Sequence, residues 1–339
     1  TNALLSACLY VQLAHQEPRP APPSADAHSG RMAWALELSV LLLAGLQAWW
    51  ILNSFEIRDS VTIIAHRGSS MVAPENTLAA VSQALEDGAH AVELDVRLSA
   101  DQQVMLYHDR TLARLTGDPR EFGDLTRREL NDIDVGSWFG DAFQNERIAG
   151  LDDALRTVRG RASLMIDMKA LPGQEQALAH AVIETLNQES DIRYRCWATQ
   201  QSALTGMAAC GFPNALMEMR MATMSPDLVR FIKAQAPELR VTLLAQLILP
   251  GTLDRRQFDA LGLRHNRISG QEVRLAARFG YEIHAWTVND RARMSALIDL
   301  GVDAIITDYP DRLRALIEDR RALSDGGLML VKLRNWLRQ

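Results

Sequence analysis

The alternation of short apolar, β-rich runs with helical segments from Val61 onward constrains the fold of this chain more than any other feature. Runs expected to form strands lie at 61–65, 91–96 with an extended continuation at 103–109, 163–169, 193–199, 241–246, 281–288 and 304–310, and two weaker ones near 214–219 and 260–264. Helical periodicity is found between them at 77–88, 151–159, 174–188, 270–280, 291–301 and 311–319. Repeated βα units with apolar strands indicate a parallel sheet covered by helices.

The length of this repeating region favours one of the two folds that such units form. Residues 61–319 are close to the ~250 residues of a (β/α)8 TIM barrel, so we predict that α/β fold. An irregular polar stretch at about 109–150 interrupts the pattern after the second strand and is expected to be a small insertion. An open doubly wound sheet is the alternative.

Polar residues gather where the predicted strands end, and in a TIM barrel that edge carries the active site. The first strand ends in His66 and Arg67, the second carries Glu93 and Asp95, and its continuation ends in His108. Because alternate residues of a strand face the same side, the two carboxylates share one face. Their joint occurrence at successive strand ends favours a functional site over isolated ion pairs or turn residues.

The later strands add a carboxylate, a lysine and an aromatic ring to the same edge. Asp167 and Lys169 stand at alternate positions of the third main strand, and Trp286 lies near the end of 281–288. Asp167 together with the two acids of the second strand would form an all-oxygen site suited to Mg²⁺ or Ca²⁺. The lysine and the arginine of the first strand would make a cradle for a phosphate. The two histidines would supply a base and an acid near neutral pH.

The order of these motifs resembles the glycerophosphodiester phosphodiesterases. The resemblance covers roughly 61–318 and rests on the motifs HRG, PENT, E-x-D, HD, IDMK, WTVN and TDYP, which occur here in that order. It implies a (β/α)8 barrel with a small insertion after the second strand. It also implies metal-dependent hydrolysis of glycerophosphodiesters to glycerol 3-phosphate and an alcohol, in an enzyme similar to the membrane-anchored bacterial branch.

The resemblance also assigns roles to single residues. It implies that His66 and His108 are the catalytic pair, with His66 the base and His108 the acid, and that Arg67 and Lys169 contact the phosphate. The implied metal ligands are Glu93, Asp95 and Asp167.

One of these ligands departs from the family, and two further residues are implied to contact substrate. The family usually has Glu where this chain has Asp167, so the ion would have to sit closer to that strand or be reached through water. Glu75 of the PENT turn would reach the glycerol hydroxyls or the surroundings of the metal, while Asn76 supports the loop. Trp286 would form an apolar wall for the glycerol carbons, with core packing as its other interpretation.

Residues 1–60 are expected to form a membrane region. The run at about 33–52 carries one charge, Glu37, and has Trp34 near one end and Trp49 near the other, which is typical of a spanning helix of ~20 residues. An apolar run at 3–14 is expected to be the end of an earlier helix, and a Pro-rich loop follows it. The balance of arginines predicts that the catalytic domain lies outside the cytoplasm, and the resemblance to the membrane-anchored bacterial branch implies a bacterial inner membrane.

Two features outside the barrel motifs remain open. Cys196 and Cys210 are expected to be two small semi-buried thiols, although an oxidising compartment would allow them to pair. The basic tail at 320–339 is either an amphipathic helix lying on anionic lipid or a last helix packed on the barrel.

The charge balance and the site chemistry limit the possible partners. With 36 Lys and Arg against 42 Asp and Glu, the chain has no cationic surplus for nucleic acid. The expected partners are a small glycerophosphodiester or lysolipid and membrane lipid. Two alternative functions remain: phospholipase D-like cleavage of lysophospholipids or sphingolipids, and a membrane-tethered protein that binds phosphodiesters without cleaving them.

Overall fold

The computed structural model describes residues 27–54, 60–200, 202–246 and 257–337, with side chains of helix α2 described between residues 34 and 47. The chain divides into two units, Thr1–Arg58 and Asp59–Gln339. In the first unit the structure describes helix α2, Ala27–Ser54. The predicted end of an earlier helix and the Pro-rich loop lie mostly or wholly outside the described residues.

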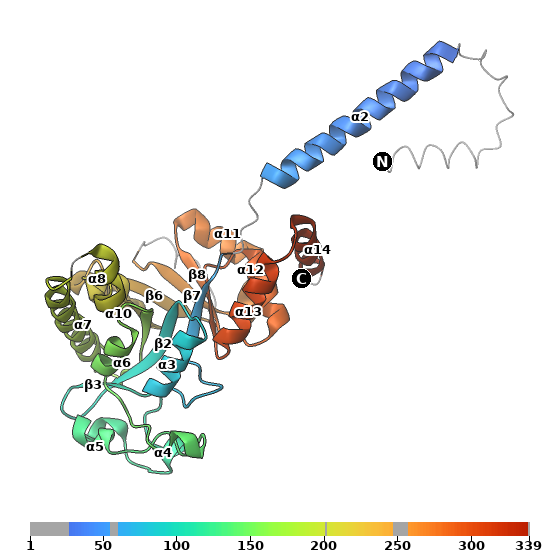
Figure 1. Ribbon diagram of the computed structural model, residues 1–339. Coiled ribbons are helices and arrows are strands. Elements are labelled where there is room, and N and C mark those ends of the chain that lie inside the picture. The colour runs from blue at the N-terminus through green and yellow to red at the C-terminus, as the bar shows by residue number, and fades with distance from the viewer. Residues whose placement is uncertain (1–26, 55–59, 201, 247–256, 338–339) are drawn as a thin grey trace. The chain divides into compact units, whose positions relative to one another are not determined.

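The second unit is a closed barrel with helices around it (Figure 1). Its strands are β1 Thr62–His66, β2 Ala91–Leu98, β3 Val104–Leu106, β4 Ser163–Met168, β5 Arg220–Thr223, β6 Arg240–Ala245, β7 Ala260–Arg264, β8 Glu282–Trp286 and β9 Ala304–Thr307. Its helices of eight or more residues are α3 Leu78–Glu86, α6 Leu151–Val158, α7 Glu175–Trp197, α8 Ala203–Cys210, α10 Pro226–Gln235, α11 Gly270–Phe279, α12 Arg291–Leu300, α13 Pro310–Arg321 and α14 Asp325–Trp336.

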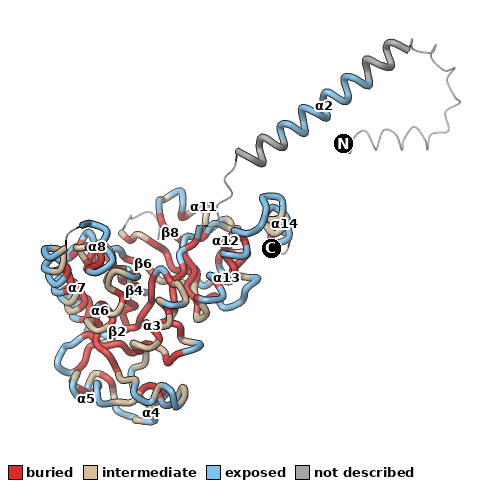
Figure 2. The backbone as a smooth tube through the Cα atoms, in the orientation of Figure 1, coloured by how far each residue is buried: buried red, intermediate tan, exposed pale blue. Residues whose placement is uncertain are grey.

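Parallel pairing closes the barrel in the order β1-β2-β4-β5-β6-β7-β8-β9 and back to β1. β3 pairs antiparallel with β2 outside this circle. The strands are almost wholly buried, as expected where helices cover a parallel sheet, and Figure 2 shows them in red. The predicted (β/α)8 barrel is confirmed, and the open doubly wound sheet is excluded.

The insertion after the second strand has its own small hydrophobic core beside the barrel. It holds the short helices α4 Ala113–Thr116, α5 Arg127–Asn131 and the single turns Phe122–Asp124 and Asp141–Phe143. Its apolar side chains gather in a separate cluster around Tyr107 and Phe122, whose rings stack with centroids 5.1 Å apart. The cluster includes Tyr107, which lies between the end of β3 and His108.

Two predicted strands are wrong. Residues 193–199 belong mainly to α7, because Arg193 is fully buried and its guanidinium bonds to Glu189 four residues earlier, at helical spacing. The run 214–219 is mainly the short helix α9, Ala215–Glu218, and the strand β5 begins just after it, at Arg220. The weak strand at 260–264 is confirmed as β7.

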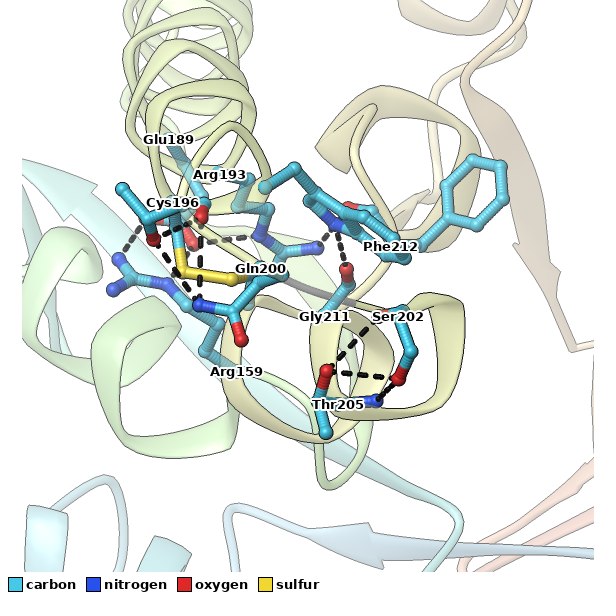
Figure 3. Close-up of a disulfide and its surroundings, with 12 residues drawn as sticks. Arg159, Glu189, Arg193, Cys196, Gln200, Ser202, Thr205, Gly211 and Phe212 are labelled. Atoms are coloured by element: carbon cyan, nitrogen blue, oxygen red, sulfur yellow. Dashed lines mark hydrogen bonds and ion pairs between the residues drawn. A yellow bond between two sulfur atoms is a disulfide. The ribbon is translucent and has the colours of Figure 1, made fainter.

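The cysteine prediction is also wrong, since Cys196 and Cys210 form a disulfide (Figure 3). It joins the end of α7 to the end of α8. Trp197 donates from its indole N–H to the carbonyl of Gly211 at 2.8 Å, so a second contact next to the bridge joins the ends of α7 and α8. The two cysteines lie on different helices with Cα atoms 5.7 Å apart, and this approach depends on tertiary packing, which their spacing in the sequence does not encode.

The C-terminal segment is a helix, α14, that packs on α12. Asn335 is buried and donates to Ser295 at 2.9 Å and to Asp299 at 2.5 Å. Lys332 lies 3.3 Å from Asp299. Of the two interpretations of this tail, packing on the barrel is the one observed.

The segment predicted to span a membrane, 33–52, lies within α2. No described helix is long and apolar enough to cross a membrane, and the transmembrane prediction is therefore not supported.

Candidate active site

A cavity of about 290 Å³ opens at the carboxyl ends of the barrel strands. It is lined by His66, Arg67, Glu93, His108, Met165, Asp167, Lys169, Met224, Leu244, Trp286, Thr287 and Ile306. Seven of the nine predicted site residues lie on this lining. The other two, Asp95 and Glu75, contact the lining residues, as described below.

Three buried carboxylates form the acidic centre of the cavity. Glu93 and Asp95 stand at alternate positions of β2, and Asp167 lies beside Asp95 in the register of β2 with β4. One oxygen from each of the three lies within 4.8 Å of the others. This is the spacing and the donor type that a hard divalent cation requires.

The protonation of these acids reflects how close and how buried they are. Burial and the negative charge of Asp95 raise the pKa of Glu93 to about 7. Burial also raises the pKa of Asp167, although the charge of Lys169 opposes it. At Asp95 burial is outweighed by Lys169 and Arg67, which lower its pKa. A cation among the three would favour the charged form of all of them.

Lys169 lies against the acids at the polar edge of the cavity. Its Nζ is 2.5 Å from Asp167 and 3.1 Å from Asp95. These charges raise the pKa of Lys169 above its usual value in spite of burial. The lysine is therefore a fixed positive charge beside the carboxylates.

Arg67 is held by three acids from different parts of the chain. Its backbone N–H donates to Glu93 at 2.9 Å, and its Nη1 donates to Glu75 at 2.8 Å. Its Nε lies 3.0 Å from Asp95, near enough for an ion pair but without a hydrogen bond. Arg114 binds the same carboxylate of Glu75 through two bonds of 2.6 and 3.0 Å. Glu75 thus bridges two arginines.

The turn after β1 has an unusual backbone that brings these groups together. Arg67 has φ 56°, and Gly68 has φ 83° where a Cβ would lie 2.6 Å from Ala80. Asn76 has φ 57° and exchanges two bonds with Asp95, of 2.9 and 3.0 Å. Asn tolerates this left-handed conformation better than most residues, so the predicted supporting role of Asn76 has a direct structural basis.

Each histidine is held through Nδ1 by a carboxylate. His66 shares a bond of 2.6 Å with Asp308, and Asp308 in turn accepts from Asn289 at 2.5 Å and from Ser70 at 3.2 Å. The other ring nitrogen of His66, Nε2, lies 4.0 Å from Glu93. Burial would lower the pKa of His66, but Asp308 and Glu93 together raise it.

His108 has the corresponding arrangement at the insertion. Its Nδ1 lies 2.7 Å from Asp109, whose other oxygen accepts from Arg114 at 2.5 Å. Burial would raise the pKa of Asp109, and the two hydrogen bonds lower it instead. Both imidazoles therefore leave Nε2 free of these carboxylates.

Sequence reasoning missed Asp308, Asn289, Asp109 and Arg114 as parts of the site. Asp308 directly follows the apolar strand β9 and lies within the TDYP motif, so a signal for it was available. Asn289 and Asp109 lie within motifs that were recognised only as family signatures. Arg114 lies in the irregular insertion, where no pattern indicates which way a side chain points.

A larger cavity, of about 560 Å³, lies at the opposite end of the barrel. Its polar groups are largely bonded to one another: Arg220 pairs with Glu282 at 2.6 Å, and His284 lies 3.2 Å from the same carboxylate. The amino ends of strands in this fold serve stability rather than catalysis. The polar groups at the carboxyl ends, by contrast, form one connected set around an open cavity.

The fold and the site together define a TIM-barrel enzyme whose cavity presents carboxylates, cationic groups and two oriented histidines to a phosphorylated substrate. The model of the Glycerophosphoryl diester phosphodiesterase family matches residues 66–312. The chain belongs to this family and is a phosphodiester hydrolase of that class.

Individual relatives agree with this assignment. A glycerophosphodiester phosphodiesterase of Caldanaerobacter subterraneus is 31% identical over 264 residues, which cover 75% of this chain and 97% of the relative. The Arabidopsis thaliana enzyme GDPD4 is 26% identical, with 76% and 74% covered. A solved phosphodiesterase of Oleispira antarctica, in complex with the product sn-glycerol-3-phosphate, is 28% identical with a TM-score of 0.66 and covers 76% of this chain and 96% of its own.

Proposed function

We propose that the enzyme hydrolyses glycerophosphodiesters to glycerol 3-phosphate and an alcohol, with a divalent cation held by Glu93, Asp95 and Asp167. The observation that carries this proposal is the convergence of three buried carboxylates, a fixed lysine and two oriented histidines on one cavity. The product bound to the Oleispira antarctica relative supports the same substrate class.

The donor set fits Mg²⁺ or Ca²⁺. All three ligands are carboxylates, the donors that hard cations prefer, and their oxygens are close enough to share one ion. Burial and the charge of Asp95 raise the pKa of Glu93, and a cation bound among the three carboxylates would favour its ionised form. A bound cation would supply charge neutralisation and Lewis acidity at a phosphate oxygen.

The residues of the chain would divide the remaining work. Arg67 and Lys169 neutralise the phosphate, and Glu75 orients the guanidinium of Arg67. His66 takes a proton from water as the water oxygen forms its bond to phosphorus. His108 gives a proton to the alcohol oxygen as its bond to phosphorus breaks.

A release assay for glycerol 3-phosphate tests this division of roles. With glycerophosphocholine as substrate, His66→Ala and His108→Ala should each reduce kcat by about 10²–10⁴-fold, while cation binding measured by calorimetry stays unchanged. Near-normal turnover in either variant would refute the assignment. Binding of substrate by the wild type without any release of product would favour the non-catalytic binding protein instead.

We also propose that the enzyme is attached to a membrane with its catalytic domain outside the cytoplasm. Two observations support this location. Disulfides persist mainly in oxidising compartments, and Cys196 is bridged to Cys210. The middle of α2 is apolar and exposed on all sides in its unit, with Leu41 and Leu42 at 69% and 63% exposure.

Fractionation of bacterial cells tests the location. The wild type should sediment with membranes and should be degraded by protease added to spheroplasts. Replacing Leu41 and Leu42 by Arg should release the protein, because a charge in hydrocarbon costs several kcal/mol. Full protection from added protease would contradict the external location, and a soluble wild type would contradict attachment.

A further inference from the structure

The catalytic cavity has two chemically different halves that follow the order of strands around the barrel. Its polar lining comes from neighbouring strands: His66 and Arg67 from the end of β1, Glu93 from β2, and Asp167 and Lys169 from β4 and its end. His108 follows β3, which pairs with β2. All charged side chains among the described residues of the lining therefore belong to one side of the barrel.

The other side of the lining is apolar. It consists of Met224 just after β5, Leu244 on β6, Trp286 on β8 and Ile306 on β9. These strands complete the circle from β5 back to β9. Thr287 is the uncharged polar residue on this side.

The apolar half is built on the interior of the barrel rather than on a loose surface. Leu244 and Trp286 pack against the buried cluster that includes Met165 and Ile306. β7 contributes Gly262 between them, where a Cβ would lie 2.5 Å from Leu244 and 3.5 Å from Trp286. The missing side chain lets these two residues approach each other and keeps this wall continuous.

The outer edge of the apolar half is open to solvent. Met224 is 61% exposed. Apolar side-chain surface that stays in contact with water is free energy that burial would recover. A glycerol group lying here would lose water without meeting a charged side chain of this half of the lining. A hydrocarbon group would instead bury both its own surface and that of Met224.

We propose that this half of the cavity binds an uncharged hydrocarbon substituent of the phosphodiester, so that the preferred substrates carry an alkyl or acyl chain next to the phosphate. The proposal rests on the phosphodiesterase function above and specifies its substrate class. The chain has two possible sources, the alcohol that leaves and the glycerol that stays, and both present the same chemistry to the wall.

Two homologous series of substrates distinguish these sources. One series is glycerophospho-n-alkyl esters with alcohols of two to eight carbons; the other is glycerophosphoethanol acylated on glycerol with two to eight carbons. Each methylene that enters the apolar half should raise kcat/KM by about threefold to fourfold. A rise in the first series assigns the chain to the alcohol, and a rise in the second assigns it to glycerol.

A flat response in both series, with every member hydrolysed, would overturn the proposal and leave the phosphodiesterase function intact. Failure to hydrolyse any member would instead count against the phosphodiesterase function itself.

Single substitutions locate the effect at the proposed wall. Met224→Gln should reduce the increment per methylene, measured as the slope of log kcat/KM against chain length, and Met224→Leu should retain that slope. Met217→Gln is the matched control, because Met217 is 53% exposed but does not line the cavity. An equal loss in Met217→Gln, or none in Met224→Gln, would contradict the assigned wall.

Discussion

The contact between His66 and Asp308 yields the sharpest prediction from the site geometry. Asp308→Asn keeps the size and shape of the side chain but removes the negative charge 2.6 Å from Nδ1 of His66. Both side chains are largely buried, with 24% and 20% of their surfaces exposed. Asn289 donates to one oxygen of Asp308, and Ser70 donates to the oxygen that His66 contacts. The substitution therefore removes the charge and also turns one of these two acceptors into a donor.

The size of the expected effect follows from the kind of bond that is lost. A hydrogen bond to a charged group contributes about 1.5–3 kcal/mol net, and each 1.36 kcal/mol of transition-state stabilisation is tenfold in rate. If the bond orients the imidazole and stabilises the imidazolium during proton transfer, kcat/KM should fall roughly tenfold to 150-fold.

The pH profile separates this role from simple structural support. Asp308 and Glu93 raise the pKa of His66, so Asp308→Asn should lower that pKa. His66 must be neutral to act as a base. At a saturating concentration of the cation, the acidic limb of the pH profile of kcat/KM should therefore move to lower pH in the variant.

The assay is steady-state release of glycerol 3-phosphate from pH 5 to pH 9. Asp311→Asn, an exposed change three residues away, is the control and should leave both rate and profile unchanged. A rate within twofold of wild type together with an unmoved profile would refute the role of Asp308. A shift of the basic limb instead would show that His66 acts as the acid.

Three further predictions concern the cation, the phosphate cradle and the disulfide. Asp167→Asn should weaken Mg²⁺ or Ca²⁺ binding by at least tenfold in calorimetry, since a charged ligand is lost, and unchanged affinity would exclude Asp167 as a ligand. Glu75→Gln should raise KM about twofold to tenfold, because Arg67 loses the charge-assisted bond that orients it; a fall in kcat alone would contradict this positioning role. Replacing Cys196 and Cys210 by Ser should lower the free energy of unfolding of the barrel by about 3 kcal/mol in urea denaturation, and an unchanged urea midpoint would show that the bridge contributes no stability.

The barrel and the principal site residues could be predicted because local pattern and fold rules agree there. Glu93 and Asp95 alternate on one strand, and strand ends in this fold meet at one edge. Once the βα pattern was recognised, the convergence of His66, Glu93 and Asp167 followed from the fold. The structure adds the distances and the burial.

The elements that could not be predicted depend on contacts between distant parts of the chain. The run 193–199 is rich in residues that favour strands, yet the buried bonds of Arg193 to Glu189 and Phe212 stabilise it as helix. Likewise, Asp308 is 242 residues from His66, and only closure of the barrel brings them together. Tertiary packing overrides local preference in the first case and creates the partner in the second.

Cation dependence of hydrolysis tests the central claim most directly. The full chain is freed of metal with EDTA, and release of glycerol 3-phosphate from glycerophosphocholine and glycerophosphoethanol is measured before and after Mg²⁺ or Ca²⁺ is added back. We expect activity to vanish in EDTA and to return with one of the two cations in the wild type, with little return in Asp167→Asn. Full activity in EDTA, or equal recovery in Asp167→Asn, would contradict a catalytic cation held by these three carboxylates.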